Sequence, residues 1–478
     1  MVASEAVPFV KTGALADAAG DLPRALVRLG HDVDVVIPRY RGVTAGTLER
    51  RLSVLNGPQA ADADFYAATT DGVRTIFVDH PGYYDRDYLY GVAERDYADN
   101  PERFAFLCRA ALAWALTEGS YDVVHAHDWQ AGLVPVLLGQ MFRTGTLPTR
   151  LPTIFTIHNL AYQGIFDASW LPRLGLPWDL MRIDAMEYWG RVSFLKAGVV
   201  FSRFITTVSP RYAEEIQLPE FGLGFDGILR ERAQDLVGIL NGIDYDRWDP
   251  RRDANLPVPY TASNLTGKQD AKRALHEELQ LPTTDDVLRR PTIGLVSRLV
   301  DQKGFDLLAA VADELPRLGA TFALLGSGDR RYEDLWLGLA ARYPDRIGVR
   351  LGYDKQLAHL ITGGADLFLM PSHSEPCGQN QMYSLRYGTV PLVRATGGLF
   401  DTVRNFDPQT GTGTGFTFDE YSPQGLLGTL RWALGVFQDR DTWRRMQIAG
   451  MQQDNSWDAS ARRYVDVYER AAASRVWA

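Results

Sequence analysis

Two cations follow an apolar run in the second half of the chain. Arg298 and Lys303 stand directly after the β-rich run 292–296. An arginine fork and a lysine point charge suit a pyrophosphate, and they would stabilise the negative charge that grows on a departing nucleotide. Two solvated cations beside a helix start are the alternative, although cations there oppose the helix dipole and need another reason to be present. The pair predicts a phosphate clamp.

A carboxylate follows the apolar run 367–370. Glu375 is followed by Pro376, Cys377 and Gly378, residues that let the backbone approach a ligand closely. The carboxylate could hold sugar hydroxyls, or it could be a favourable acid in a first helical turn. Cys377 has no base spaced beside it, so we interpret it as a pocket-wall thiol rather than a nucleophile.

A glycine pair follows the next apolar run, 391–393. Thr396, Gly397 and Gly398 would expose backbone amides in the manner of an anion-binding nest. Gly-Gly turns are common, so this motif indicates a ligand only together with its neighbours.

The N-terminal motif contains Lys11 and Gly13 between a short strand and a helix. Free amides and the positive end of the helix dipole suit a phosphate or a polar sugar there. An ordinary strand–helix turn is the alternative, and the longer Gly-rich spacing of a full phosphate loop is missing.

Polar residues also follow two strands of the first half. His125, His127 and Asp128 could suggest a metal site, but no further ligand is evident, which disfavours one. We interpret the segment as a sugar-binding edge, with Asp128 accepting hydroxyl hydrogen bonds and Trp129 as an apolar wall. His158 ends the next strand, and both a structural and a functional role are open.

Short apolar runs alternate with amphipathic helices along the whole chain, which predicts doubly wound α/β domains. Ligands of such sheets bind beyond the carboxyl ends of the strands, so a cleft between two such domains would collect the residues above. The predicted strands are 33–37, 74–78, 122–126, 153–157, 204–208, 236–240, 292–296, 320–325, 347–351, 367–370 and 391–393.

A proline-rich break between 249 and 291 separates the two series of strands. We therefore predict an N-terminal Rossmann-like domain over residues 1–245 and a C-terminal one over 246–455. Residues 456–478 contain a last helix that is compatible with either domain, and we assign it as crossing back to the first.

Composition excludes several classes of partner. The 478 residues carry a formal charge of −9, which disfavours nucleic acid. No apolar run approaches a membrane span, and the first residues do not have the pattern of a signal peptide. The two cysteines, Cys108 and Cys377, form no disulfide framework, so we expect a cytoplasmic protein.

Taken in order, the motifs resemble those of bacterial glycogen synthase and plant starch synthase, the ADP-glucose-dependent enzymes, over essentially the whole chain. The matching segments are Lys11-Thr12-Gly13, His125-Ala126-His127-Asp128-Trp129, Thr156-Ile157-His158-Asn159, Asn241-Gly242-Ile243-Asp244, Arg298 with Lys303-Gly304, Glu375-Pro376-Cys377-Gly378 and Thr396-Gly397-Gly398-Leu399.

The resemblance implies a GT-B architecture, in which two Rossmann-like doubly wound domains face a central cleft. It also implies retaining transfer of glucose from ADP-glucose to the non-reducing end of an α-1,4-glucan such as glycogen. Neither a metal nor another cofactor is expected, and neither nucleic acid nor a membrane is an expected partner. No oligomeric state follows from the residues.

The resemblance also implies roles for individual residues. Arg298 and Lys303 would bind phosphate, Glu375 would contact the donor glucose, and Tyr353 would stack on adenine. The expected catalytic residues are His158, Asp128, Glu375, Arg298 and Lys303. The expected donor-binding residues are Lys11, Gly13, Asn159, Asn241, Tyr353, Cys377, Gly378, Thr396, Gly397 and Gly398, and the sugar-site residues are Tyr97 and Trp129.

The chain departs from the family pattern at several positions. Ala14 stands where the family usually has glycine, and His373-Ser374 stands where it commonly has Arg-Phe. Ala395 replaces a basic residue, and Phe400 replaces a small one. Two alternatives therefore stay open: a related GT-B transferase that uses UDP-glucose or another acceptor, and a catalytically silent glucan-binding protein.

Overall fold

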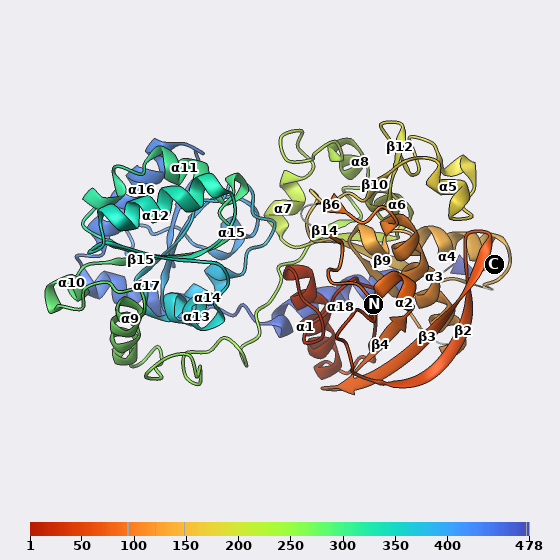
Figure 1. The fold of residues 1–478 in the computed structure, drawn as a ribbon, viewed down its shortest axis with the longest axis horizontal. Coiled ribbons are helices and arrows are strands. Elements are labelled where there is room, and N and C mark those ends of the chain that lie inside the picture. Colours follow the sequence, from red (N-terminus) through yellow and green to blue (C-terminus); the bar gives the residue numbers. More distant parts are fainter. Residues whose placement is uncertain (93–94, 120, 148, 475, 478) are drawn as a thin grey trace. The chain divides into compact units, whose positions relative to one another are not determined.

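The chain folds as two units of alternating strands and helices (Figure 1). The computed structural model describes residues 1–92, 95–119, 121–147, 149–474 and 476–477. Unit 1 consists of Met1–Gly242 and Trp457–Ala478, and unit 2 consists of Ile243–Ser456. The division predicted from the sequence falls three residues later, after residue 245, and likewise assigns the last helix to the first unit.

Unit 1 is built on a large mixed sheet. Val2 bridges Val36 on one side and Ala126 on the other, and thereby joins two four-stranded parts, β1-β4-β3-β2 and β14-β13-β9-β7. All pairs are parallel except β2–β3 and β3–β4. The strands are β1 (Asp34–Pro38), β2 (Thr47–Asn56), β3 (Gln59–Thr70), β4 (Val73–Asp79), β7 (Val124–His127), β9 (Thr153–Ile157), β13 (Phe204–Thr207) and β14 (Leu236–Gly238).

Shorter strands of unit 1 form separate antiparallel ribbons. They are β5 (Gly91–Val92) with β6 (Arg95–Asp96), β8 (Thr149–Arg150) with β21 (Val476–Trp477), and β10 (Ile165–Phe166), β12 (Arg191–Ser193) and β11 (Glu187–Tyr188). The helices of unit 1 are α1 (Ala14–Arg28), α2 (Pro81–Tyr84), α3 (Asn100–Glu118), η1 (Trp129–Ala131), α4 (Val134–Arg143), α5 (Trp170–Arg173), η2 (Trp178–Leu180), α6 (Phe194–Phe201), α7 (Pro210–Glu215), α8 (Asp226–Glu231) and α18 (Trp457–Ala473).

The last helix packs into the core of unit 1 beside the first. Trp457, Tyr464 and Val467 of α18 are buried in one cluster with Leu22 and Leu26 of α1, and Figure 1 shows the two helices side by side. An apolar stripe at helical spacing on each helix supplies this contact.

Unit 2 has a six-stranded, wholly parallel sheet in the order β17-β16-β15-β18-β19-β20. Its strands are β15 (Thr292–Val296), β16 (Thr321–Gly326), β17 (Ile347–Leu351), β18 (Leu367–Met370), β19 (Val390–Arg394) and β20 (Phe416–Phe418). Its helices are α9 (Thr266–Glu278), α10 (Asp285–Arg289), η3 (Asp301–Lys303), α11 (Phe305–Ala310), η4 (Leu315–Arg317), α12 (Arg330–Arg342), α13 (Lys355–Gly364), α14 (Asn380–Arg386), α15 (Gly397–Thr402), α16 (Pro423–Val436) and α17 (Arg440–Met451).

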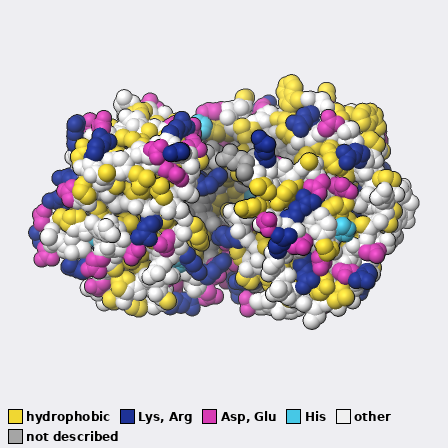
Figure 2. Space-filling view, viewed as in Figure 1, with side chains coloured by type: hydrophobic (Ala, Val, Ile, Leu, Met, Phe, Trp, Pro, Cys, Tyr) yellow, Lys and Arg dark blue, Asp and Glu magenta, His cyan; other side chains and the backbone are white. Residues whose placement is uncertain are grey.

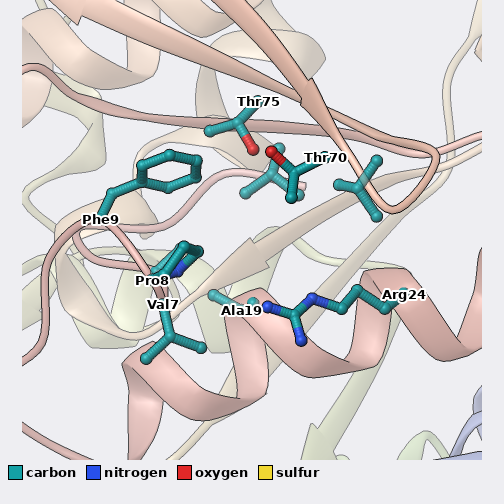
Figure 3. A pocket seen from close by; sticks show the side chains of 11 residues that line it. Val7, Pro8, Phe9, Ala19, Arg24, Thr70 and Thr75 are labelled. Carbon is teal, nitrogen blue, oxygen red and sulfur yellow. The ribbon is translucent and has the colours of Figure 1, made fainter. Parts of the chain in front are cut away.

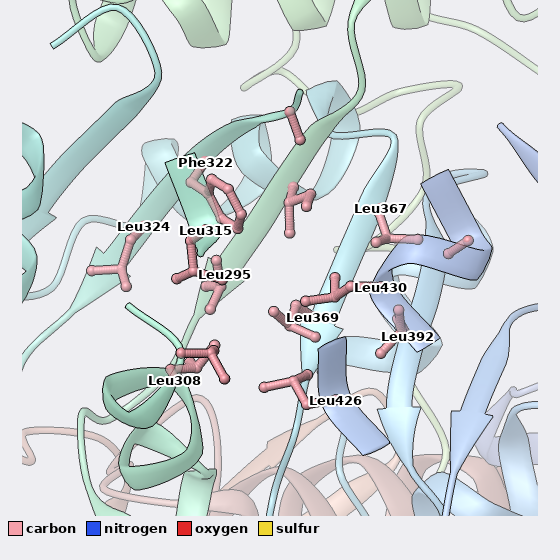
Figure 4. Close-up of a cluster of buried hydrophobic side chains, with 14 of the residues drawn as sticks. Leu295, Leu308, Leu315, Phe322, Leu324, Leu367, Leu369, Leu392, Leu426 and Leu430 are labelled. Carbon is pink, nitrogen blue, oxygen red and sulfur yellow. The ribbon is translucent and has the colours of Figure 1, made fainter. Parts of the chain in front are cut away.

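Helices cover both faces of this sheet. On one face, leucines of β15, β16, β18 and β19 pack against α11 and α16, as Figure 4 shows. On the other face, Leu275 of α9 and Leu360 of α13 pack against Phe368 of β18. Burial on both sides explains why these strands are continuous apolar runs in the sequence.

The parallel strands predicted from the sequence are present, and so are the helices that begin at Ser209-Pro210 and near residue 267. Ser209 caps its helix by accepting a hydrogen bond from Tyr212 N (2.8 Å), as the capping pattern predicts. The antiparallel strands β2 and β3 were not predicted, because β2 is largely exposed and lacks an apolar run.

Charges of both signs are interspersed over the faces in view in Figure 2, in keeping with the modest net charge. Within the described part of the chain, no helix is both long enough and apolar enough to cross a membrane.

Candidate functional site

Loops after β15 and β18 join at the carboxyl edge of the unit 2 sheet. His373 N donates a hydrogen bond to Gln302 O (2.9 Å) and so links the two loops. Gly304 has a φ of +80°, and a Cβ added there would stand 2.1 Å from Pro371 O. Only glycine permits this approach of one backbone to the other. The motifs around residues 298 and 375, far apart in the sequence, therefore form one surface.

Lys303 and Glu375 form an ion pair on this surface. Lys303 Nζ lies 2.5 Å from Glu375 Oε2, and Ser372 Oγ donates to the same oxygen (3.1 Å). Glu375 is buried, so its carboxylate needs such partners to offset the loss of hydration. Arg298, by contrast, is exposed, and its side chain makes neither a hydrogen bond nor an ion pair with any residue that the structure describes.

The loop after β19 completes the same surface. A Cβ added at Gly397 would stand 2.0 Å from Glu375 O, and one at Gly398 would stand 2.0 Å from Cys377 O. Gly397 also has a φ of +46°. The glycine pair that suggests an anion nest therefore has a packing role as well, because it lets the two loops touch. Thr396 is buried at the N-terminus of α15.

The remaining unit 2 candidates differ in exposure. Tyr353 is 91% exposed and follows Gly352, whose φ is +105°, so its ring is open to stacking by a ligand. Cys377 is a buried free thiol. Gly378 has a φ of +70°, and a Cβ there would collide with the side chain of Gln381.

In unit 1, the ends of β7 and β9 bring Asp128 and His158 together. His158 N donates a hydrogen bond to Asp128 Oδ1 (2.7 Å). Asp128 has a φ of +55° and a ψ of −177°, which lies outside the left-handed helical region and is a strained backbone conformation for a residue other than glycine. Burial raises the pKa of the Asp128 carboxyl to about 7, although the backbone hydrogen bonds from His158 and Asn159 oppose the rise.

Three buried histidines lie behind this contact. His125 has partners on both ring nitrogens, Tyr468 Oη (2.8 Å) and Thr156 Oγ1 (2.6 Å). His127 Nδ1 lies 3.0 Å from His158 Nε2. His127 Nε2 and His158 Nδ1 have no partner among the described residues. Burial lowers the pKa of His158 to about 3 and that of His127 well below its ordinary value, so both rings are neutral at pH 7.

The N-terminal loop holds Lys11 by an interaction that the sequence did not reveal. Both carboxylate oxygens of the buried Asp17 accept hydrogen bonds from Lys11 Nζ, at 2.8 and 2.7 Å. Buried Glu5 accepts hydrogen bonds from the backbone and the hydroxyl of Thr12, and burial raises its pKa. A Cβ added at Gly13 would meet open space. In the sequence, the one sign that Glu5 and Asp17 hold Thr12 and Lys11 is that both residues are acidic.

The other unit 1 candidates occupy different environments. Trp129 is buried between Phe104 and Phe166, so its ring packs in the interior of unit 1. Tyr97 lies partly exposed beside the guanidinium groups of Arg86 and Arg103.

Two asparagines complete the unit 1 candidates. Asn159 Oδ1 accepts a hydrogen bond from Ala161 N (3.0 Å). Asn241 is buried, and its Oδ1 has no partner in the described structure. An unpartnered buried oxygen is costly unless a ligand or water satisfies it.

No group of three or more His, Cys, Asp or Glu that could hold a metal occurs among the described residues. A pocket of unit 1 lies between the N-terminal loop and α1, lined by Val7, Pro8, Phe9, Ala19 and Arg24 among others (Figure 3). None of the candidate residues lines that pocket.

Comparisons with known proteins agree over the whole chain. The family model described as the starch synthase catalytic domain matches residues 1–231, and glycosyl transferases group 1 matches residues 282–447. The glycogen synthase of Koribacter versatilis is 48% identical over 99% of this chain and 98% of its own length.

Two solved structures are also similar to this chain. The catalytic domain of starch synthase IV from Arabidopsis thaliana, bound to ADP and acarbose, is 34% identical with a TM-score of 0.89, and covers 99% of this chain and 98% of its own. Sucrose-phosphate synthase from Thermosynechococcus elongatus, 18% identical over 95% of this chain and 92% of its own, has a TM-score of 0.57 and shows the fold alone. The predicted GT-B fold class is confirmed.

Asp128→Asn should remove a pH-dependent loss of stability. The folded pKa of Asp128, about 7, lies above the ordinary value of 3.8, so the wild type loses stability as the pH rises from about 4 to about 7 and does not regain it above. Asparagine keeps an oxygen for His158 N and carries no charge. The variant should therefore gain stability relative to the wild type by on the order of 1–3 kcal/mol between pH 5 and pH 8. Thermal unfolding of both proteins at pH 5 and at pH 8 measures this gain. The same difference in stability between variant and wild type at both pH values would contradict the prediction.

Gly398→Ala should force apart the loops that carry Cys377 and Gly398, because the added methyl group cannot stand 2.0 Å from a carbonyl oxygen. We expect a loss of roughly 1–3 kcal/mol in the free energy of unfolding, typical of overpacking. Gly338→Ala is the matched control, since a Cβ at Gly338 in α12 meets nothing within 4 Å and alanine favours a helix. Equal unfolding midpoints in urea for the two variants would show that the close approach of Gly398 to Cys377 O does not affect stability.

Proposed function

The chain belongs to the glycogen and starch synthase family and is a hexosyltransferase, and we propose that it transfers glucose from ADP-glucose to the non-reducing end of an α-1,4-glucan. The observation that carries the proposal is the meeting of Lys303 and Glu375 where the loops after β15 and β18 join. A cation for phosphate and a carboxylate for sugar hydroxyls stand there side by side, as a nucleotide sugar requires.

ADP is the proposed nucleotide because starch synthase IV, 34% identical over 99% of this chain, was solved bound to ADP and acarbose. In the proposed complex, Arg298 and Lys303 bind the diphosphate and Tyr353 stacks on the adenine. Arg298 and Tyr353 are exposed and available for these roles. Backbone amides near Thr396, Gly397 and Gly398 would lie beside the donor.

Donor binding would rearrange the Lys303–Glu375 pair. Both hydrogen bonds to this carboxylate from described side chains reach Oε2, which leaves Oε1 for a glucose hydroxyl. The diphosphate would compete for the ammonium group of Lys303, while Ser372 continues to donate to Glu375. The pair thus keeps a buried carboxylate satisfied until the sugar arrives.

We propose that the transfer retains the anomeric configuration. As the bond between the anomeric carbon of glucose and the diphosphate breaks, negative charge grows on ADP, and Arg298 and Lys303 would stabilise that charge. The glucosyl group would pass as an oxocarbenium-like species on the face of the leaving group, and the departing phosphate would accept the proton of the attacking hydroxyl. The two-carboxylate arrangement of glycosidases is not part of this proposal.

On unit 1, the proposal assigns the sugar to Asp128, His158, Asn159 and Asn241. His158 Nδ1 and Asn241 Oδ1 are buried without a partner in the described structure, so they have hydrogen-bonding capacity to offer hydroxyl groups. Lys11, held by Asp17, is the unit 1 cation that we propose for donor binding.

We further propose that the reaction needs no metal, since Arg298 and Lys303 supply the positive charge that a metal would otherwise provide. A cytoplasmic location is proposed because both cysteines are buried free thiols, which suits a reducing compartment. Nucleic acid and membranes are not proposed partners.

Release of nucleoside diphosphate on mixing the purified chain with glycogen and a nucleotide sugar tests the function. We expect ADP-glucose to support turnover at least about tenfold faster than UDP-glucose, a difference of 1.4 kcal/mol in transition-state binding. EDTA should leave the rate unchanged. Faster turnover with UDP-glucose would reassign the donor, and no release with either would favour a silent glucan-binding protein.

Lys303→Ala should lower kcat by roughly 100- to 1,000-fold, the usual cost of removing a group that stabilises transition-state charge. The variant should still fold, because Ser372 Oγ continues to donate a hydrogen bond to Glu375 Oε2. Arg330→Ala is the matched control, because Arg330 is an almost fully exposed cation of unit 2 outside the three loops. Full glucan synthesis by Lys303→Ala at saturating donor would show that the clamp assignment is wrong.

A further inference from the structure

The three buried histidines of unit 1 differ in how far their ring nitrogens are used. His125 is satisfied on both sides, by Tyr468 of α18 and by Thr156, whose hydroxyl also contacts Thr206. That network is complete and explains His125 as a structural residue. His127 and His158 use one ring nitrogen each for the hydrogen bond between them. The second nitrogen of each ring has no partner in the described structure.

Proton counting fixes what this histidine pair (His127 and His158) can offer. Two neutral imidazoles carry two N–H groups, and one of these lies in the shared hydrogen bond of 3.0 Å. The two outer nitrogens therefore always comprise one N–H donor and one lone-pair acceptor. Burial lowers the pKa of both rings, so the neutral state persists at neutral pH. Such a pair matches hydroxyl groups, which both donate and accept.

The position of His127 allows it to hold the His158 ring in one orientation. It is the last residue of β7, is almost wholly buried, and its ring lies against that of His125 with centroids 4.0 Å apart. The backbone N–H of His158 is already held by Asp128. The contact with His127 is the hydrogen bond that the described structure provides to the His158 ring, so it sets the rotation of that ring and couples its tautomer to that of His127, because one ring must donate where the other accepts.

We propose that His127 is a positioning residue, which orients the imidazole of His158 and couples the tautomers of the two rings, so that their outer nitrogens present one donor and one acceptor to sugar hydroxyl groups. The inference deepens the proposed function and rests on it. It names a residue that acts through His158 rather than on the substrate directly.

The test compares His127→Leu, which removes the ring nitrogens, with His127→Asn, which keeps a polar atom near the position of Nδ1. For His127→Leu we expect kcat to fall by roughly 10- to 100-fold, as when the support of an active group is lost, with KM for ADP-glucose changed by less than about threefold. His127→Asn should recover most of this loss. Tyr468→Phe, at the other end of the buried network, is the control and should keep kcat within about twofold of the wild type.

Folding is checked by binding of ADP, which the proposal assigns to unit 2 and which should be unchanged in all three variants. Should His127→Leu fail to bind ADP or to fold, His127→Phe takes its place, since it keeps a ring without nitrogens. A folded variant without the nitrogens that retains the wild-type kcat would overturn the inference. So would equal losses in His127→Leu and His127→Asn.

A second measurement does not depend on turnover. In the ¹⁵N spectrum of histidine-labelled protein, the Nε2 signal of His158 should move in His127→Leu, because that nitrogen loses its hydrogen-bond partner in the variant. An unchanged Nε2 signal of His158 in that variant would refute the inference even if the chain used another donor. Failure of the wild type to release ADP from ADP-glucose would instead count against the proposed function alone.

Discussion

The contact of Gly397 and Gly398 with the backbone of residues 375–377 is the constraint on which the surface formed by the loops after β15, β18 and β19 depends. No side chain fits in either place, because a Cβ would overlap a carbonyl oxygen. The contact fixes the loop that carries Glu375, and Glu375 in turn holds Lys303 by an ion pair. A substitution in the glycine pair would therefore be transmitted to charged groups that the glycines do not touch.

A different constraint governs unit 1, where polar groups are buried at the carboxyl ends of β7 and β9. Burial favours the uncharged form of each group, so His127 and His158 are neutral and Asp128 is only partly ionised near pH 7. Such groups cost stability unless they are hydrogen-bonded. Some of their hydrogen bonds are made within the unit, while outer nitrogens of the histidine pair have no partner in the described structure. Buried polar atoms that lack a hydrogen-bond partner, despite their cost in stability, are typical of a binding site.

The sequence was sufficient for the parallel strands and for the positions of the motifs that follow them. Continuous apolar runs identify strands buried on both faces, whereas β2 and β3 escape notice because much of their surface is polar and exposed. The pairing of side chains was not accessible in the same way. His127 meets His158 because β7 and β9 pair in parallel with His127 opposite Thr156, and a shift of one residue would turn the ring to the other face. Likewise, only the folded loops show that Asp17 binds Lys11.

The two units thus provide different electrostatic environments, and this difference suits the proposed reaction. Unit 2 offers the cations Arg298 and Lys303 at the ends of its loops, where negative charge would develop on the departing diphosphate. In unit 1, burial keeps His127 and His158 uncharged, and a glucosyl group that becomes positive in the transition state would be destabilised by an imidazolium but not by a neutral ring. Neutral donors and acceptors can still orient its hydroxyl groups. The burial that lowers the histidine pKa values therefore suits the proposed chemistry as well as being a consequence of packing.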